Sequence, residues 1–267
     1  MSEFKRGIEN SNFIKELNNN SHWQQIIKDD DLFVAIRNEY INVYYYGQSI
    51  AKIEFVKNKI KWTTHKKYLG IDEEGYSETG VYLDKLEELK QNAKRYGGKE
   101  KEQVKKHILQ DKALCVLDVE VTFGREEGFG KRSIDYLVAE KNDLGNIHLV
   151  FYEAKHFDNS EIRAREIPKV FEQMEKYEIA LNDPAHKTEI LNSYKTIFKN
   201  VLELNLSIKD KLVKLVGATF DNVEIDIEPR LIIFEIDPLK IGDIHIEKLK
   251  QKFGEKRLIL KERIANG

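Results

Sequence analysis

The sequence has little of what secreted or membrane-inserted proteins depend on. Its one cysteine, Cys115, can form neither a disulfide within the chain nor a thiolate zinc site. No run of about 18 apolar residues is present, which excludes a membrane-spanning helix. The start, MSEFKRGIEN, has no apolar stretch typical of a signal peptide. These absences predict a cytoplasmic protein with no membrane partner.

An excess of charge of one sign is lacking as well. The 267 residues contain 44 Lys and Arg against 46 Asp and Glu, for a formal net charge of −2. This balance excludes a uniformly basic surface, so a surface that binds nucleic acid would have to be a local patch. Hydrophobic residues make up 41% of the chain. That fraction is too high for a disordered chain and is sufficient for a packed core.

The first part of the chain changes from helical to strand-like periodicity. Residues 1–30 have apolar residues at helical spacing, whereas residues 31–68 contain four short runs rich in β-branched and aromatic residues. Turn residues separate these runs, which predicts a four-stranded antiparallel meander. We therefore expect an N-terminal helix plus four-stranded antiparallel β module over residues 1–75, followed by a glycine-rich, acidic loop at residues 69–82.

The second part alternates helices and strands. A helix ending near residue 109 precedes three closely spaced strands, and further helices and strands follow. This order predicts an α/β (α+β) domain over residues 83–267, with a central mixed sheet flanked by helices. The predicted elements after the first helix are strands 113–123, 132–140 and 147–155, helices 166–182 and 188–204, strands 213–220 and 230–237, helix 244–253 and strand 257–261.

Residues 134–155 contain the side chains that could carry chemistry. The segment NDLGN is a turn centred near Leu144, and Asp135 and Glu153 lie nine positions on either side of that centre. If the flanking strands form a simple hairpin, the two carboxylates stand opposite each other with Cβ atoms about 5 Å apart. Carboxylates this close repel unless a proton or a cation lies between them, and oxygen ligands suit Mg²⁺. Strand alternation points Lys155 to the same face as Glu153.

A structural ion-pair cluster explains these three residues as well as a metal site does. Acids and bases each form about one sixth of the chain, so an acid-x-base triplet is expected about seven times by chance. The apolar run IHLVFY before Glu153 adds weight to the metal site, because charged groups on a buried strand are costly unless they are paired or coordinating. The residues alone leave both interpretations open.

Two motifs together are more specific than the triplet. Ile134-Asp135 is followed, after seventeen residues, by Phe151-Tyr152-Glu153-Ala154-Lys155. Gln173 and Tyr177 then stand four apart on one face of the next predicted helix. This pattern resembles the D…(D/E)-x-K signature of the PD-(D/E)XK nuclease superfamily and the Q-x-x-x-Y motif of its RecB-type members. The resemblance covers about residues 99–182 and excludes the N-terminal meander. Isoleucine stands where the signature has proline.

The resemblance implies a restriction-endonuclease-like core and a metal-dependent phosphodiesterase. Asp135 and Glu153 would bind Mg²⁺ or Mn²⁺, with the backbone carbonyl of Ala154 as a further ligand. Lys155 would position or deprotonate the attacking water and neutralise charge on the phosphate. The Q-x-x-x-Y pair would hold the Lys155 side chain or a substrate phosphate, whereas the alternative is a partly exposed amide and a tyrosine at the edge of the core.

Further acids are candidate metal ligands. Family members often carry a glutamate on the helix before the first strand, and both Glu100 and Glu102 fit this position. In the next strand, alternation points Asp118 and Glu120 to the same side, next to the strand of Asp135. Glu120 is the better candidate of the two for a second metal or its water shell.

A lysine-rich segment is the candidate nucleic-acid-binding surface. Residues 56–68, VKNKIKWTTHKKY, contain five lysines and no acid, with Trp62 among them as a candidate for stacking on a base. The alternative is a solvated edge hairpin whose lysines prevent aggregation. The candidate residues are Lys57, Lys59, Lys61, Trp62, Lys66 and Lys67.

The expected function is a Mg²⁺- or Mn²⁺-dependent nuclease acting on nucleic acid, with DNA favoured over RNA. A role in prokaryotic defence against foreign DNA is what the resemblance suggests. The N-terminal module would bind substrate, a partner protein or a second copy of the chain. The alternatives are a non-catalytic nucleic-acid-binding or assembly protein on the same scaffold, and a binder of small nucleotides.

Overall fold

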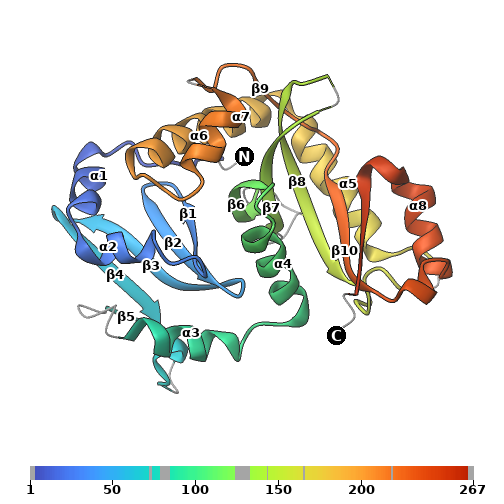
Figure 1. Cartoon of the computed structure of the whole chain (residues 1–267), viewed down its shortest axis with the longest axis horizontal. Coiled ribbons are helices and arrows are strands. Elements are labelled where there is room, and N and C mark those ends of the chain that lie inside the picture. Colours follow the sequence, from blue (N-terminus) through green and yellow to red (C-terminus); the bar gives the residue numbers. More distant parts are fainter. Residues whose placement is uncertain are drawn as a thin grey trace.

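The structure is a computed structural model of the whole chain and describes residues 4–71, 74–78, 85–123, 133–142, 144–164, 166–217 and 219–263. Within these ranges it is an α+β protein with two β-sheets (Figure 1). An antiparallel sheet near the N-terminus precedes a mixed sheet that helices flank, which confirms the predicted fold class. Residues 124–130, GREEGFG, which connect the predicted strands 113–123 and 132–140, lie outside the described residues.

The first sheet is an antiparallel meander with its strands in chain order. Four strands are predicted, but the structure has a fifth, β5, within the segment predicted to be a connecting loop. Helices α1 and α2 begin at Asn10 and Asn20, whose side chains accept hydrogen bonds from backbone N–H groups of the first turn. The elements are α1 (Ser11–Asn18), α2 (Ser21–Ile26), β1 (Phe33–Ile36), β2 (Tyr40–Tyr45), β3 (Gln48–Val56), β4 (Lys59–His65), η1 (Lys66–Leu69) and β5 (Tyr76–Glu78).

Two tight turns build the β2–β3–β4 part of this sheet. Tyr46-Gly47 joins β2 to β3 and Lys57-Asn58 joins β3 to β4, and all four residues have positive φ, between 50° and 66°. Positive φ at both central residues defines a type I′ turn, whose twist matches that of the flanking strands. Because β3 has nine residues, the two turns lie about 30 Å apart at opposite ends of the strand.

The second sheet is organised around β8. Strand β7 pairs with β8 antiparallel on one side, and β9 and β10 pair with it parallel on the other. Nearly every residue of β8 is buried, as its apolar sequence predicts. The strands are β6 (Cys115–Thr122), β7 (Ser133–Lys141), β8 (Ile147–His156), β9 (Val223–Ile225), β10 (Arg230–Ile236) and β11 (Leu258–Glu262).

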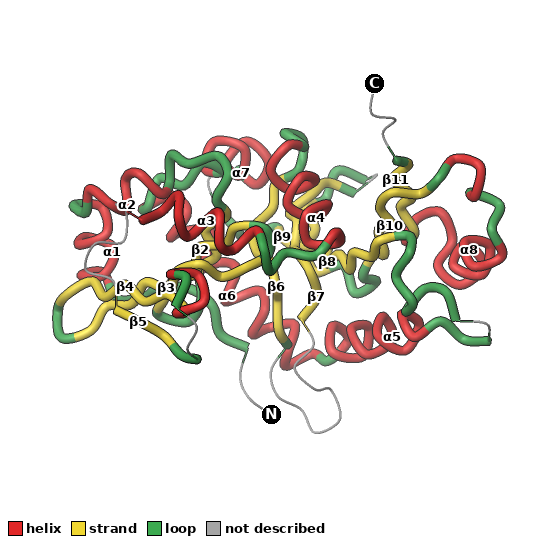
Figure 2. Tube along the Cα trace, turned by 90° about the horizontal axis from the view of Figure 1, so that it is seen from below, coloured by secondary structure: helices red, strands yellow, loops and turns green. Residues whose placement is uncertain are grey.

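Helices cover both faces of this sheet (Figure 2). On one face, Tyr136 and Val138 pack with Val104 and Ile108 of α4. On the other, β7 and β8 belong to the apolar core that includes α5 and α6. Both faces of β7 and β8 are therefore covered, and the alternation of side chains along each strand decides which of them face α4. The helices are α3 (Leu86–Lys94), α4 (Lys99–Gln110), α5 (Lys169–Asn182), α6 (Pro184–Glu203), α7 (Lys209–Val216) and α8 (Ile244–Arg257), with the short η3 (Pro238–Lys240).

One predicted strand is wrong. Residues 213–220 are predicted to form a strand, but residues 209–216 form helix α7, and Leu212 is its buried residue. A short apolar run is equally compatible with a strand or with the buried side of a helix, and here the preceding residues extend the helical spacing.

The two sheets share one interior. The larger apolar core extends from Phe13 in α1 to Phe253 in α8 without interruption. Arg37, which follows β1, forms a buried ion pair with Asp118 of β6 and donates a hydrogen bond of 2.6 Å to the carbonyl of Val119. The N-terminal sheet is therefore fixed against the second sheet by packing and by a buried charge pair.

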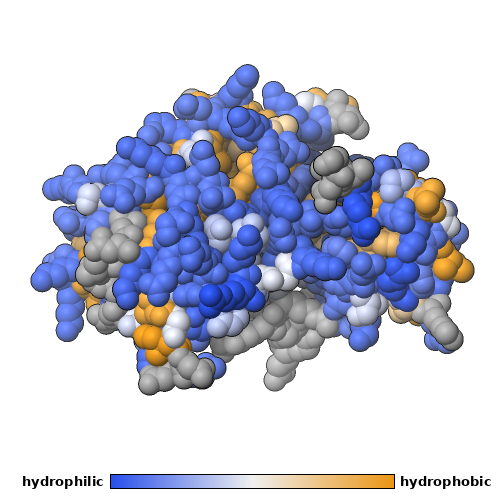
Figure 3. All heavy atoms as spheres, turned by 60° about the horizontal axis from the view of Figure 1, so that its bottom comes forward, coloured by the Kyte–Doolittle hydropathy of each residue, from blue (hydrophilic) through white to orange (hydrophobic). Residues whose placement is uncertain are grey.

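The surface is mostly polar on the face shown in Figure 3. Apolar side chains gather there at the end of the molecule where α8 lies. Leu239 and Ile244, beside and within α8, are 94% and 66% exposed. No helix in the described part of the chain is long and apolar enough to span a bilayer.

Candidate active site

The β7–β8 hairpin has the register that the sequence predicts. Tyr136 pairs with Tyr152, so Asp135 and Glu153 occupy the next position along the two strands. There the Asp135 carboxylate accepts a hydrogen bond of 2.8 Å from the backbone N–H of Ala154. The two acids are thus brought together at the point where the ladder between the strands ends.

Glu153 is held by three side chains. Lys155 donates to its Oε1 at 2.6 Å, and Gln173 Nε2 donates to the same oxygen at 2.6 Å. The Tyr177 hydroxyl lies 3.3 Å from Oε2 and within hydrogen-bond distance of the Ser133 carbonyl, at 3.1 Å. Gln173 and Tyr177 therefore hold Glu153, whereas the predicted target of this pair is the Lys155 side chain or a substrate phosphate. Both are buried in the structure, which corrects the alternative of an exposed amide.

Lys155 is bound by a second acid, Glu161, which is not among the residues predicted from the sequence. Its Nζ lies 3.0 Å from Glu161 Oε2, in the loop after β8. The Lys155 side chain is 7% exposed, and that of Glu161 is 37% exposed. The ammonium group is therefore held between a buried and a partly exposed carboxylate. Glu161 stands six residues beyond Lys155 in an irregular loop, where periodicity gives no signal.

The electrostatics of this cluster favour additional positive charge. Burial and the Glu153 carboxylate raise the pKa of Asp135 well above its usual range. Burial raises the pKa of Glu153 to about 7, although Lys155 opposes this effect. Burial lowers the pKa of Lys155, but the carboxylates of Glu153, Glu100 and Asp135 together outweigh burial, and the net pKa is raised. One ammonium group therefore does not fully compensate the two carboxylates, and a divalent cation would.

The structure distinguishes between the two candidate glutamates on α4. Glu100 Oε2 accepts hydrogen bonds from the His156 backbone N–H at 3.0 Å and from Asn159 Nδ2 at 2.8 Å, so it reaches the end of β8. Glu102 instead forms an exposed ion pair with Lys106, one helical turn away at 3.1 Å. Glu100 is therefore the glutamate of this helix that lies near Glu153 and Lys155.

Glu120 and Asp118 do not share a face, contrary to the prediction from alternation. The register irregularity of β6 lies between Val116 and Asp118 and so precedes both acids, whereas the φ of +50° at Glu120 interrupts the alternation after Asp118. Asp118 is fully buried against Arg37, whereas Glu120 lies opposite Asp135 and is bound by Lys101 at 3.1 Å. Bulges and positive φ concentrate next to functional sites, where they re-aim side chains.

The donor set fits a Mg²⁺ ion. Mg²⁺ keeps several waters and is typically bound through one or two carboxylates together with substrate phosphates. Asp135 Oδ1 accepts no hydrogen bond from the described residues, and it stands beside the Glu153 carboxylate. Within the described ranges, no group of three or more His, Cys, Asp or Glu side chains is arranged as a complete metal cage. The site thus offers two carboxylates and would take the remaining ligands from water, backbone and substrate.

The predicted lysine-rich patch is divided in the structure. Trp62 is 8% exposed, so its ring is part of the core and does not offer a face to a base. This corrects its predicted role in stacking. Lys57 and Lys59 lie at the β3–β4 turn, at the opposite end of β3 from the turn that contacts Lys101. Lys67 lies on the aromatic rings of Tyr68 and Tyr96. The remaining members are Lys61 in β4 and Lys66 in η1.

Comparisons with known proteins give no independent assignment. No protein family, curated protein or solved structure matched this chain.

Proposed function

We propose that this chain is a metal-dependent nuclease of the PD-(D/E)XK type, which hydrolyses phosphodiester bonds of nucleic acid, with DNA as the expected substrate. The observation that carries the proposal is the convergence of Asp135, Glu153 and Lys155 at one end of a hairpin. Glu153 and Lys155 are buried in contact, at 2.6 Å, beside a second carboxylate, Asp135, whose charge Lys155 does not compensate. Neither the spacing of these residues in the sequence nor the composition of the chain requires this arrangement. A purely structural ion pair would need only one of the two acids.

Each residue has a chemical task in this proposal. A divalent ion at the Asp135 and Glu153 carboxylates would supply an activated water and positive charge at the phosphate. Lys155 adds a fixed positive charge where negative charge develops on the phosphate oxygens. Gln173 and Tyr177 hold the Glu153 carboxylate in one orientation, as second-layer partners of metal ligands do.

Cleavage assays with and without metal test this proposal. The purified chain is incubated with plasmid, linear duplex, single-stranded DNA and RNA, in Mg²⁺, in Mn²⁺ and in EDTA. We expect cleavage with either metal and none in EDTA. Calorimetric titration with Mn²⁺ alone gives a readout that does not depend on turnover. Absence of cleavage of every substrate, or cleavage unaffected by EDTA, overturns the proposal; binding without cleavage would identify the non-catalytic alternative.

Glu100 and Glu102 form a matched pair for testing the site. Glu100→Gln is expected to lower the cleavage rate about 10- to 100-fold, because Glu100 holds the end of β8 beside Lys155. Glu102→Gln makes the same chemical change two residues away on an exposed ion pair and is expected to leave the rate within about twofold. The cleavage rates of the two variants are measured at saturating Mg²⁺ and compared with that of the original chain. Equal rates for the two variants would remove Glu100 from the site.

A further inference from the structure

Lys155 has two carboxylate partners that differ in their freedom to move. The Glu153 side chain is 3% exposed, and its carboxylate is also held by Gln173, at 2.6 Å, and by the Tyr177 hydroxyl, at 3.3 Å. The Glu161 side chain is 37% exposed, and in the described part of the chain its carboxylate contacts only Lys155. Of the two acids, Glu161 is therefore the one that can leave Lys155 without breaking other side-chain contacts.

The backbone on both sides of Glu161 is fixed, so its side chain can move while the loop stays in place. The Glu161 N–H donates to Asn159 Oδ1 at 2.9 Å, and the Glu161 carbonyl accepts from the Val170 N–H at 3.2 Å. Asn159 in turn donates to Glu100 at 2.8 Å, and the next residue of the loop, Ile162, is fully buried. Rotamer changes of exposed side chains are complete within nanoseconds, so the Glu161 carboxylate can leave and return without rearrangement of the backbone.

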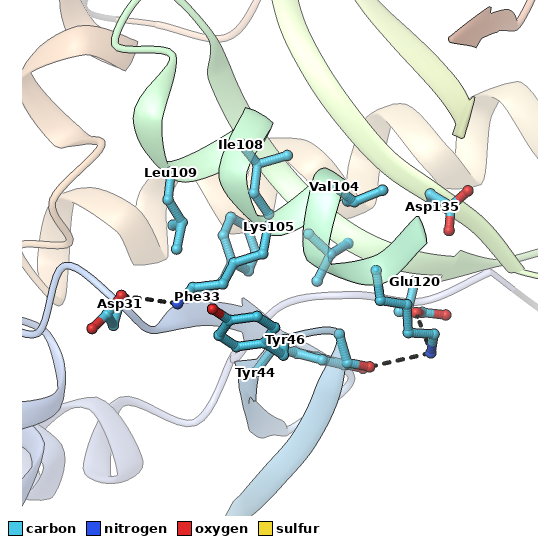
Figure 4. Close-up of a pocket in the computed structure, with 13 residues that line it drawn as sticks. Asp31, Phe33, Tyr44, Tyr46, Val104, Lys105, Ile108, Leu109, Glu120 and Asp135 are labelled. Atoms are coloured by element: carbon cyan, nitrogen blue, oxygen red, sulfur yellow. Dashed lines mark hydrogen bonds and ion pairs between the residues drawn. The ribbon is translucent and has the colours of Figure 1, made fainter. Parts of the chain in front are cut away.

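The proposed active site is closed on the side that faces the N-terminal sheet. Figure 4 shows Asp135 and Glu120 at one end of the gap between α4 and that sheet. The gap holds about 30 Å³, roughly the space of one water molecule, and Lys101 binds Glu120 at its wall, at 3.1 Å. A phosphate group does not fit there. We therefore expect nucleic acid to approach Lys155 from the loop after β8, where Glu161 is exposed.

The charge of Lys155 does not require Glu161. Glu153 already contacts the ammonium group at 2.6 Å, and the Asp135 carboxylate adds a second negative charge that acts on Lys155. A third carboxylate makes the cluster more negative and repels the phosphate of a substrate. Neutralisation of Lys155 therefore does not explain the Glu161 contact, whereas competition with a substrate does.

A phosphate and the Glu161 carboxylate compete for the same ammonium group. An ammonium group has three N–H donors, and it binds carboxylate and phosphate oxygens through the same charge-assisted hydrogen bonds. Lys155 directs one donor to Glu153, and its Nζ lies 3.0 Å from Glu161. A phosphate oxygen that binds Lys155 from the exposed side would lie close to the Glu161 carboxylate, and like charges at such distances repel.

We propose that Glu161 is an exchangeable counter-ion, which takes the place of a substrate phosphate at Lys155 and is displaced when nucleic acid binds. The inference rests on the proposed nuclease function and adds how its site is regulated. In the empty site, Lys155 is held between Glu153 and Glu161; in the occupied site, the phosphate replaces Glu161. The contact is self-inhibitory, because each phosphate that binds has to displace it.

Glu161→Gln removes the competing charge and keeps the size of the side chain. It is expected to lower the KM for cleavage of a DNA duplex in Mg²⁺ about tenfold, because the phosphate no longer meets a carboxylate. The kcat is expected to stay within about threefold, since Glu153 still holds Lys155. The affinity for a fluorescent DNA duplex, measured by anisotropy in EDTA, should rise as much as the KM falls. If Glu161 only held Lys155 in place, kcat would fall and the KM would not change; that result overturns the proposal.

Glu166→Gln is the matched control. Glu166 is an exposed acid five residues further along the chain, before α5, so the variant makes the same chemical change and the same change in net charge. It is expected to leave the KM and the affinity within about twofold of the original. An equal gain in affinity for both variants would show a general effect of net charge and would overturn the proposal.

A double-mutant cycle tests whether Glu161 acts through Lys155. Lys155→Met keeps the length of the side chain but leaves no ammonium group for which carboxylate and phosphate compete. In this background, Glu161→Gln is expected to change the affinity for the duplex less than about twofold. Affinity in EDTA is the readout, because it does not depend on turnover. A tenfold gain that persists without Lys155 contradicts the proposal.

The outcomes separate this inference from the proposed function. Cleavage with equal KM values for the original chain and Glu161→Gln leaves the proposed function standing and overturns the inference. A gain in affinity for Glu161→Gln without cleavage by any protein supports the inference and overturns the proposed function. If the original chain and the variant bind the duplex equally, or if neither binds it, the inference is overturned.

Discussion

Asp135→Asn is expected to eliminate cleavage and, at the same time, to make the folded protein more stable. Asparagine can still accept the hydrogen bond from the Ala154 backbone, so the local structure is retained. It cannot serve as an anionic metal ligand, and the cleavage rate should fall by at least about 10³-fold. Removing the half-buried Asp135 carboxylate, which faces the buried Glu153 carboxylate, relieves their repulsion and is expected to raise the free energy of unfolding by about 1–2 kcal/mol.

Metal-dependent stability gives this prediction a second measurement. Mg²⁺ binds only the folded site, so it should raise the melting temperature of the original chain. The Asp135→Asn variant should start from a higher melting temperature and respond little to Mg²⁺. Asp221→Asn is the control, because Asp221 is an exposed acid paired with Lys195; it should change neither the cleavage rate nor the response to Mg²⁺. A destabilised Asp135→Asn protein would indicate a structural role instead.

The sequence predicts the part of the site that depends on the register of one hairpin, β7–β8. A tight turn fixes which residues of β7 and β8 face each other, and that was sufficient to bring Asp135 opposite Glu153. Helical spacing likewise placed Gln173 and Tyr177 on one side of α5. Their target was not predictable from the sequence, because it depends on how α5 packs on the sheet. Glu161 lies in a loop, where no periodicity identifies contacts.

The predictions that the structure contradicts fail for local physical reasons. Alternation along β6 breaks at Glu120, because its φ of +50° re-aims the side chain, so that Asp118 contacts Arg37 and Glu120 contacts Lys101. Trp62 was misassigned because an alternating strand leaves open which of its faces is buried until the opposing elements, α1 among them, are placed.

Asp118→Asn is expected to destabilise the fold strongly, although Asp118 lies outside the proposed active site. The Asp118 side chain is fully buried and forms ion pairs with Arg37 and, at 3.5 Å, with Arg6, while accepting a hydrogen bond of 3.0 Å from the Tyr194 hydroxyl. Asparagine keeps the size but leaves buried guanidinium groups without a counter-charge. Breaking a buried pair in this way costs about 3–5 kcal/mol.

Urea unfolding of the Asp118→Asn variant measures the loss in the free energy of unfolding, and a variant that removes an exposed ion pair is the control. Glu172→Gln removes an exposed ion pair with Lys176 on α5 and is expected to lower the free energy of unfolding by only about 0.3–0.5 kcal/mol. A loss below about 1 kcal/mol for Asp118→Asn would show that the guanidinium groups find water or other partners.

The Asp118→Asn variant also tests whether the contacts that stabilise the fold are separate from those that carry out cleavage. Asp118 joins the two sheets through Arg37, but its carboxylate makes no contact with Asp135, Glu153 or Lys155 among the described interactions. At a temperature where Asp118→Asn remains folded, its cleavage rate should therefore match that of the original chain. A lower rate in fully folded protein would mean that the contact between the sheets also sets the position of Glu120, two residues further along β6 beside Asp135.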